Sequence, residues 1–172
     1  MRSAAHEIAL VGLVAGALSC ASSSPSNPAD SGASDSTFGC KADVRAQTYS
    51  ANMQKPGMAG SFTFALVSAS PAPPARGDNI WVLKVLDQGG SPVKDATFPP
   101  QATWAGWPVG VLPSMPDHGH RSPAQPTVTP NSDGTYRIEP LFFSMPGLWQ
   151  ITINVLSGST TDSAQFSFCI EG

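Results

Sequence analysis

Residues whose side chains could bind a metal ion gather between Met115 and Met145. Met115 stands three residues before His118, and His120 follows two residues later. Thioether sulfur suits the soft Cu(I) ion, and imidazole suits copper in general. Side chains two residues apart in an extended segment project to the same side, so both imidazoles could serve one ion. The predicted ligands of this copper site are Met115, His118, His120 and Met145.

The same residues also have a purely structural interpretation. Methionine is a common gap-filler in protein cores, so Met115-Pro116 and Met145-Pro146 can simply pack and turn. The two histidines then only hydrogen-bond across a loop, and Asp117 is an ordinary loop residue instead of a group that orients an imidazole. No Cys, Asp or Glu cluster joins the histidines. The sequence alone favours this structural interpretation, because it does not show ligand geometry.

The composition favours short strands over helices. The 172 residues include 17 prolines and 16 glycines, about a fifth of the chain and well above the usual share. Such a chain is expected to form short strands joined by many turns. Only 12% of the residues are charged, the net charge is -3, and Lys and Arg are scattered singly. A nucleic-acid partner is therefore not expected.

About seven short strands are expected. The alternation of apolar and polar residues is clearest from Trp149 to Val155 and from Ser163 to Ile170, and residues 80–86 are apolar enough for a central strand. The remaining strands are expected at residues 61–68 and 135–143, at an edge within 42–58, and within 93–102. The predicted fold class is all-β, an immunoglobulin-like β-sandwich.

The N-terminus has the features of a signal peptide, predicted at residues 1–19. Arg2 precedes an uncharged run of eleven residues, Ile8 to Leu18, which is too short to span a bilayer as a helix. Ala17-Leu18-Ser19-Cys20 resembles the lipobox of bacterial lipoproteins, with the preferred Leu one place later than expected. The resemblance implies a lipid on Cys20 and a periplasm-facing envelope protein. Ala21 after the cysteine favours the outer membrane, and conventional cleavage after Ala21 is the alternative.

Three cysteines are present, and a lipid on Cys20 leaves an even pair. Cys40 and Cys169 bracket nearly all the chain after the tether, as expected for a disulfide in an oxidising compartment. Cys169 falls opposite the core-facing residues of its strand, so the bond would pin the N-terminal segment across that strand's outer face or edge. Two free thiols are the alternative. Residues 20–39 are predicted to be a flexible Ser/Pro-rich tether to a domain at residues 40–172.

The motifs around the histidines resemble those of a known family. The sequence Met115-Pro116-Asp117-His118-Gly119-His120 is followed by Gly134-x-Tyr136 and by Phe143-x-Met145-Pro146-Gly147-x-Trp149. This combination is similar to the YtkA-like (FixH-like) domain over a core of about 35 residues. The resemblance implies an exported or membrane-tethered β-sandwich whose relatives are often associated with copper. The family commonly carries Met where His118 stands, which leaves the ligand set of this chain open.

Other chemistries have weaker support, and the chain is predicted not to be an enzyme. A blue-copper site needs a Cys beside two His, whereas Cys40 and Cys169 are expected to bond to each other. Ser114 lacks the recognisable turn of an activated serine. Asp133 and Glu139 fall in a turn and on a solvated strand face, so no carboxylate pair is available for acid–base catalysis.

Two functional hypotheses follow. The first is a lipid-anchored cell-envelope protein that binds or passes on copper through the predicted Met/His ligands. The second is a non-metal accessory or adhesion module, in which the same loop contacts a protein partner in the envelope.

Overall fold

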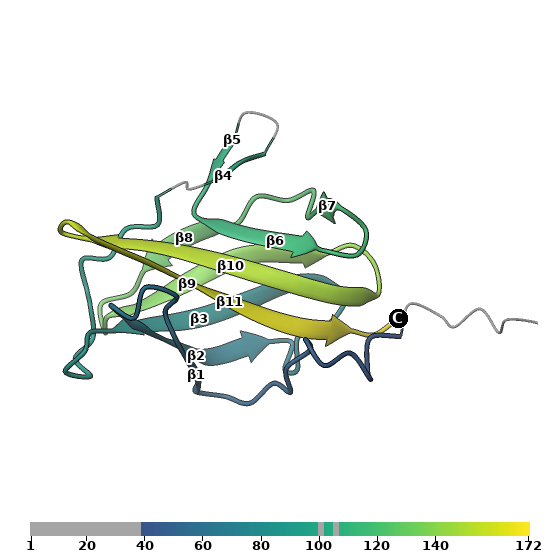
Figure 1. Cartoon of the computed structure of the whole chain (residues 1–172), viewed down its shortest axis with the longest axis horizontal. Helices are drawn as coiled ribbons and strands as arrows, with labels where there is room; N and C mark the ends of the chain where they lie inside the picture. Colours follow the sequence, from purple (N-terminus) through teal and green to yellow (C-terminus); the bar gives the residue numbers. More distant parts are fainter. Residues whose placement is uncertain (1–38, 100–101, 105–106) are drawn as a thin grey trace, which may run out of the picture. The chain divides into compact units, whose positions relative to one another are not determined.

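The computed structural model describes residues 39–99, 102–104 and 107–172. Two antiparallel sheets enclose one hydrophobic core (Figure 1). The strand order is β1-β2-β3-β9-β8 in the five-stranded sheet and β11-β10-β6-β7 in the four-stranded sheet. The predicted all-β sandwich is confirmed, with nine strands in its two sheets instead of about seven. The predicted signal peptide, Cys20 and the tether up to residue 38 lie outside the described residues.

The strands of the five-stranded sheet are β1 (Met53–Pro56), β2 (Thr63–Ser70), β3 (Gly77–Leu86), β9 (Thr135–Phe143) and β8 (Thr127–Pro130). Those of the four-stranded sheet are β11 (Thr160–Ile170), β10 (Gly147–Ser157), β6 (Val111–Met115) and β7 (His120–Arg121). The short strands β4 (Ala102–Trp104) and β5 (Trp107–Val109) form a separate hairpin (Figure 1). Among the described residues, no helix is long and apolar enough to cross a membrane.

The core is built by the alternation that the sequence predicts. The apolar face of β10 is fully buried, and its residues are Trp149, Ile151, Ile153 and Val155. Trp81 faces it from β3, the central strand of the other sheet, and meets the Phe166 and Phe168 rings of β11 edge-on at centroid distances of 6.0 and 5.5 Å. Aromatic rings from both sheets therefore lock the two layers together.

Among the described residues, one expected strand is not formed, and several strands form that were not expected, among them the short β4, β5, β7 and β8. The strand expected within 93–102 is not formed there: Thr97 makes an isolated bridge to Leu156, and the two prolines that follow cannot continue a ladder. Conversely, β6 was not expected, because glycine and proline interrupt the apolar run before it. Pro113 is tolerated inside β6 because the neighbour on one side, β7, has only two residues. The Pro113 carbonyl still accepts a hydrogen bond from the Ser122 N–H at 3.0 Å.

The N-terminal segment, residues 39–58, closes the free edge of β11. The predicted disulfide is confirmed: Cys40 and Cys169 are bonded, with their Cα atoms 5.2 Å apart. Gln47 then extends the β11 ladder, donating its N–H to the Ser167 carbonyl at 2.8 Å and accepting the Ser167 N–H on its side-chain oxygen at 2.9 Å. The disulfide closes a loop with a sequence separation of 129 residues. In the chain-entropy model such a loop stabilises the fold by about 5 kcal/mol.

A buried carboxylate fixes the loop between β1 and β2. Asp162, at the start of β11, is 4% exposed and accepts four backbone N–H bonds at 2.8–2.9 Å, from Ala59, Ser61, Phe62 and Ser163. Burial on its own raises the pKa of the Asp162 carboxyl, but the four N–H donors outweigh it and lower the pKa below its ordinary value. The charged form of this residue therefore stabilises the fold.

We expect Asp162→Asn to lower the free energy of unfolding at pH 7 by about 1–3 kcal/mol, because an amide cannot accept all four N–H bonds. The folded-state pKa lies below the unfolded value of about 3.9, so the contribution of Asp162 is present above that value and is lost as the pH falls through the folded pKa. Urea unfolding from pH 7 to pH 2 should therefore show the gap between wild type and variant closing in acid. Asp87→Asn is the control, because the exposed Asp87 carboxylate accepts a single hydrogen bond among the described residues, from the Ser91 N–H. A pH-independent gap would contradict this account of Asp162.

Candidate metal centre

The hairpin of β6 and β7 brings the first two predicted ligands together. Met115 ends β6 and His120 begins β7, and the two residues are directly opposite in the antiparallel register. Opposite residues of an antiparallel pair project to the same face of the sheet. Met115 is 1% exposed and belongs to the hydrophobic core, so this face is the inner one. The His120 imidazole therefore starts beside the Met115 thioether.

His118 lies in the tight turn between these strands. The His118 and Gly119 N–H groups both point to the Met115 carbonyl, at 3.3 and 3.0 Å, and Gly119 has a φ of +64°. The expectation that both histidines lie in one extended segment is therefore wrong, because His118 precedes the strand that carries His120. The two rings are nevertheless neighbours, with centroids 5.5 Å apart.

Gly147, the first residue of β10, lies close to the side chains of Met115 and His118. A Cβ built on Gly147 would lie 2.6 Å from Met115 Cε and 3.9 Å from His118 Nε2. The thioether end of Met115 and the ring of His118 thus converge on one point from different elements. Gly147 also has a φ of +132°, a conformation that side chains rarely adopt.

The hydrogen bonding of His120 leaves one ring nitrogen available. His120 Nδ1 lies 3.2 Å from the His118 carbonyl oxygen, which can only accept, so Nδ1 carries the proton and donates. In the neutral ring Nε2 then holds a lone pair. Nε2 is enclosed and has no hydrogen-bond partner among the described residues. Metal-binding histidines commonly have this arrangement, with one N–H on a backbone carbonyl and the other nitrogen toward the ion.

Met145, the fourth predicted ligand, lies in the turn before β10. Its side chain is partly buried against the core. Its carbonyl accepts the Trp149 indole N–H at 3.0 Å, and the Trp149 ring packs on Phe143 with centroids 5.1 Å apart. The described contacts of Met145 therefore give it a role in the turn.

Two carboxylates that line a pocket with His118, Asp117 and Asp43, are both engaged by Arg45. Among the described residues, no three of His, Cys, Asp and Glu gather as a metal cluster. Asp117, which could have oriented an imidazole, instead accepts a bidentate pair of hydrogen bonds from Arg45 at 2.8 and 2.6 Å. Arg45 also holds Asp43, and its hydrogen bonds lower the pKa of the Asp43 carboxyl to about 2 and that of Asp117 below its usual value. A pocket of about 220 Å³ beside these groups is lined in part by Asp43, Asp117, His118 and Gly147.

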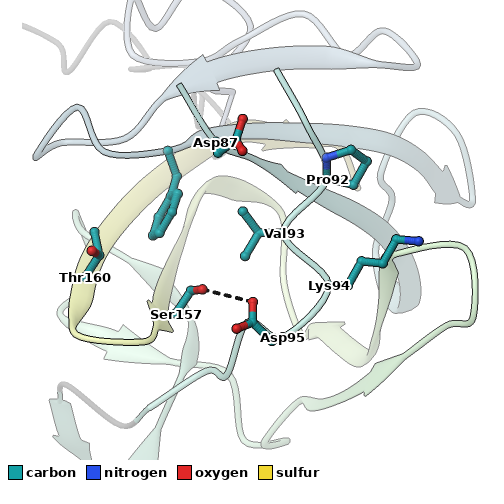
Figure 2. Close-up of a pocket in the computed structure, with 8 residues that line it drawn as sticks. Asp87, Pro92, Val93, Lys94, Asp95, Ser157 and Thr160 are labelled. Carbon is teal, nitrogen blue, oxygen red and sulfur yellow. Dashed lines mark hydrogen bonds between the residues drawn. The ribbon is translucent and has the colours of Figure 1, made fainter. Parts of the chain in front are cut away.

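A larger hollow lies at the other end of β10. It measures about 400 Å³ and has Asp87, Lys94 and Asp95 on its rim (Figure 2). Asp95 accepts the Ser157 hydroxyl at 2.9 Å, as the dashed line in Figure 2 shows, and Asp87 accepts the Ser91 N–H at 2.8 Å. Both carboxylates thus hold loop conformations, and the hollow has no histidine, cysteine or methionine in its lining.

The fold and the site define a β-sandwich domain that carries a Met/His turn at one end. Residues 57–154, more than half of the chain, match the YtkA-like family. The chain therefore belongs to the YtkA-like family, as the sequence motifs indicated. No curated protein matches the chain. The matched residues include all four predicted metal ligands, whereas Cys40, Arg45 and Cys169 lie outside them.

Two residues of the site had no predicted role. The Pro146-Gly147 pair signals a turn, but only the close approach of Met115 shows why residue 147 carries no side chain. Arg45 lies 72 residues before Asp117 in the sequence, and no local pattern connects the two. Such a pairing becomes visible only when the fold brings distant segments together.

We expect Gly147→Ala to destabilise the domain by about 2–4 kcal/mol, because the new methyl group meets Met115 Cε and the backbone is strained. Gly158→Ala is the matched control: its φ is +58° and nothing lies within 4 Å of an added Cβ. That variant should cost only the backbone strain, about 1–2 kcal/mol. Urea unfolding of the two variants makes the comparison. Equal losses would mean that Met115 does not occupy the space above Gly147.

Proposed function

We propose that this chain is a cell-envelope lipoprotein whose YtkA-like domain binds or passes on Cu(I) through Met115, His118 and His120, with Met145 as a further candidate ligand. The observation that carries the proposal concerns His120: its Nδ1 donates to a carbonyl, and its Nε2 is enclosed on the face that holds Met115, with no hydrogen-bond partner among the described residues. One thioether and two imidazoles form a donor set suited to Cu(I).

The surroundings of the donors favour a soft ion. Met115 is buried in the core, so an ion that reaches its sulfur must give up water on that side. Strongly hydrated ions such as Mg²⁺ retain their waters and prefer oxygen ligands. The nearest carboxylates, Asp117 and Asp43, are held by Arg45. These features support a site for a weakly hydrated, sulfur-binding ion.

The proposed role is binding or transfer, without catalysis. The residues that converge at the site are soft ligands, and Ser114 nearby uses its hydroxyl on the Gln150 carbonyl at 3.4 Å. The chemistry of the site is therefore that of holding and releasing an ion. Copper is the cargo in this proposal, and the protein supplies a shaped, partly dry binding place for it.

The proposed envelope location has independent support from the disulfide. A bond between Cys40 and Cys169 forms and persists in an oxidising compartment such as the periplasm. Cys20, nineteen residues of tether and the first disulfide cysteine then follow in order along the chain. We propose lipid attachment at Cys20, with residues 20–39 as the spacer between a membrane, by preference the outer membrane, and the domain.

Copper binding is tested by competition with a Cu(I) chelator on purified chain carrying Cys20→Ala, so that no free thiolate contributes. His118→Ala with His120→Ala should lose Cu(I) binding. Met115→Leu should weaken Cu(I) binding at nearly constant core volume, because it removes the sulfur alone. Met58→Leu, at a methionine 70% exposed, is the control, and Met145→Leu tests the fourth ligand. Equal binding by wild type and the double histidine variant would exclude the copper site and leave a partner-binding accessory or adhesion module.

Lipid attachment is tested in the full-length chain by Cys20→Ala. The variant should leave the membrane fraction or remain unprocessed, because the modified thiol is gone. Cys40→Ala with Cys169→Ala is the control, since it removes two cysteines and keeps Cys20. A Cys20→Ala chain that fractionates and migrates as the wild type does would contradict lipidation at this residue.

A further inference from the structure

Three charged side chains connect the N-terminal segment to the turn that carries His118. Arg45 donates two hydrogen bonds to Asp117, from Nη1 to Oδ1 at 2.8 Å and from Nη2 to Oδ2 at 2.6 Å. Its Nε and Nη2 also donate to both oxygens of Asp43, and its backbone N–H donates to Asp43 Oδ1 at 2.8 Å. The guanidinium therefore forms a fork on each of two carboxylates.

The backbone on both sides of Arg45 is fixed. On one side Cys40 is bonded to Cys169 of β11, and the Cys40 carbonyl accepts the Asp43 N–H at 3.0 Å. On the other side Gln47 makes two hydrogen bonds to the Ser167 backbone. A long side chain usually loses much rotamer freedom when it forms an ion pair. Here the carboxylate of Asp43 and the anchored backbone already restrict the Arg45 side chain before it meets Asp117.

The contact from Arg45 is made to the turn at residues 116–119. Residues 116–119 are all exposed, and the backbone N–H groups of His118 and Gly119 share one acceptor, the Met115 carbonyl. Asp117 is the residue directly before His118. A fork on the Asp117 carboxylate therefore fixes the peptide from which the His118 side chain extends.

We propose that Arg45 is a positioning residue for the turn at residues 116–119, called the metal turn below. Arg45 holds Asp117 and thereby keeps the His118 ring over Gly147 and beside His120. The same contact engages both oxygens of Asp117, which makes this carboxylate less available to the ion as a hard ligand. The inference rests on the proposed copper function for its effect on binding, but its effect on the turn is independent of any metal. Arg45 lies outside the residues matched to the family, so it is a feature of this chain's N-terminal segment.

Charge and geometry predict opposite effects of removing Arg45. Loss of a positive charge near the site favours a bound cation, so electrostatics alone would strengthen Cu(I) binding. Loss of the two hydrogen bonds to Asp117 makes the turn more mobile, and this geometric effect would weaken Cu(I) binding. Arg45→Lys keeps the charge but cannot form two forks, and it therefore separates the two effects. Lys41→Gln is the matched control, because Lys41 lies in the same segment and, in the part of the chain that the structure describes, its ammonium pairs with the exposed Glu171 at 2.9 Å.

The experiment compares wild type, Arg45→Gln, Arg45→Lys and Lys41→Gln in the chain carrying Cys20→Ala. Amide hydrogen exchange of Gly119 by NMR, without metal, reports the order of the turn, and chelator competition reports Cu(I) affinity. We expect Arg45→Gln to exchange several-fold faster at Gly119 and to bind Cu(I) about tenfold more weakly, as for residues that orient a ligand. Arg45→Lys should show the same directions with smaller changes, and Lys41→Gln should match wild type.

Three results would overturn the inference: unchanged Gly119 exchange in Arg45→Gln, Cu(I) binding that stays the same or becomes tighter, or equal changes in Lys41→Gln. Failure of the proposed function has a different signature, because wild type itself would not compete with the chelator. In that case Gly119 exchange alone decides whether Arg45 orders the turn.

Discussion

The register in which β6 pairs with β10 decides which side chains reach the candidate metal centre. Ile151 pairs with Pro113 and Gln150 with Ser114, so Met115 falls on the inner face of the sandwich. A shift of one residue would turn Met115 outward and place Ser114 in the core. Two neighbours accommodate the inward side chain of Met115. His120 lies opposite it in the strand pair, and Gly147 has no side chain that would collide with it. Core packing and the position of the proposed ligand Met115 thus depend on the same pairing.

The N-terminal segment serves both the sandwich and the site. It closes the β11 edge through Gln47, which removes a row of unpaired backbone groups that another chain could otherwise use. The disulfide fixes the beginning of this segment, and Arg45, between the two anchors, reaches the metal turn. The exposed ion pairs of Arg45 would be weak by themselves and would be screened by salt. In our proposal these ion pairs can order the turn because the backbone that carries the Arg45 guanidinium is itself anchored on both sides.

The sequence predicts the features that depend on local alternation. The faces of β9, β10 and β11 follow directly from residues such as Tyr136, Ile151 and Phe166, and the disulfide follows from the even pair of cysteines and the position of Cys169. Features that depend on distant contacts escape it. β6 is obscured by the glycines and proline that interrupt the apolar run before it, and Pro113 is acceptable within β6 only because its neighbour β7 is so short. Arg45 and Gly147 acquire roles only from the groups that folding places beside them, Asp117 and Met115.

The structural and the copper interpretations of the Met/His turn explain Met115 and His118 equally well, and they differ in how they explain His120. Burial of Met115 suits both, because a methionine packs well in a core whether or not its sulfur binds an ion. The turn at His118 also suits both, since any β-hairpin needs a connection. His120 is different, because its Nε2 is enclosed and has no hydrogen-bond partner among the described residues, and leaving a buried nitrogen unpaired costs free energy. A cation at Nε2 would offset this cost, and the neighbouring thioether of Met115 would make the soft Cu(I) ion the preferred one.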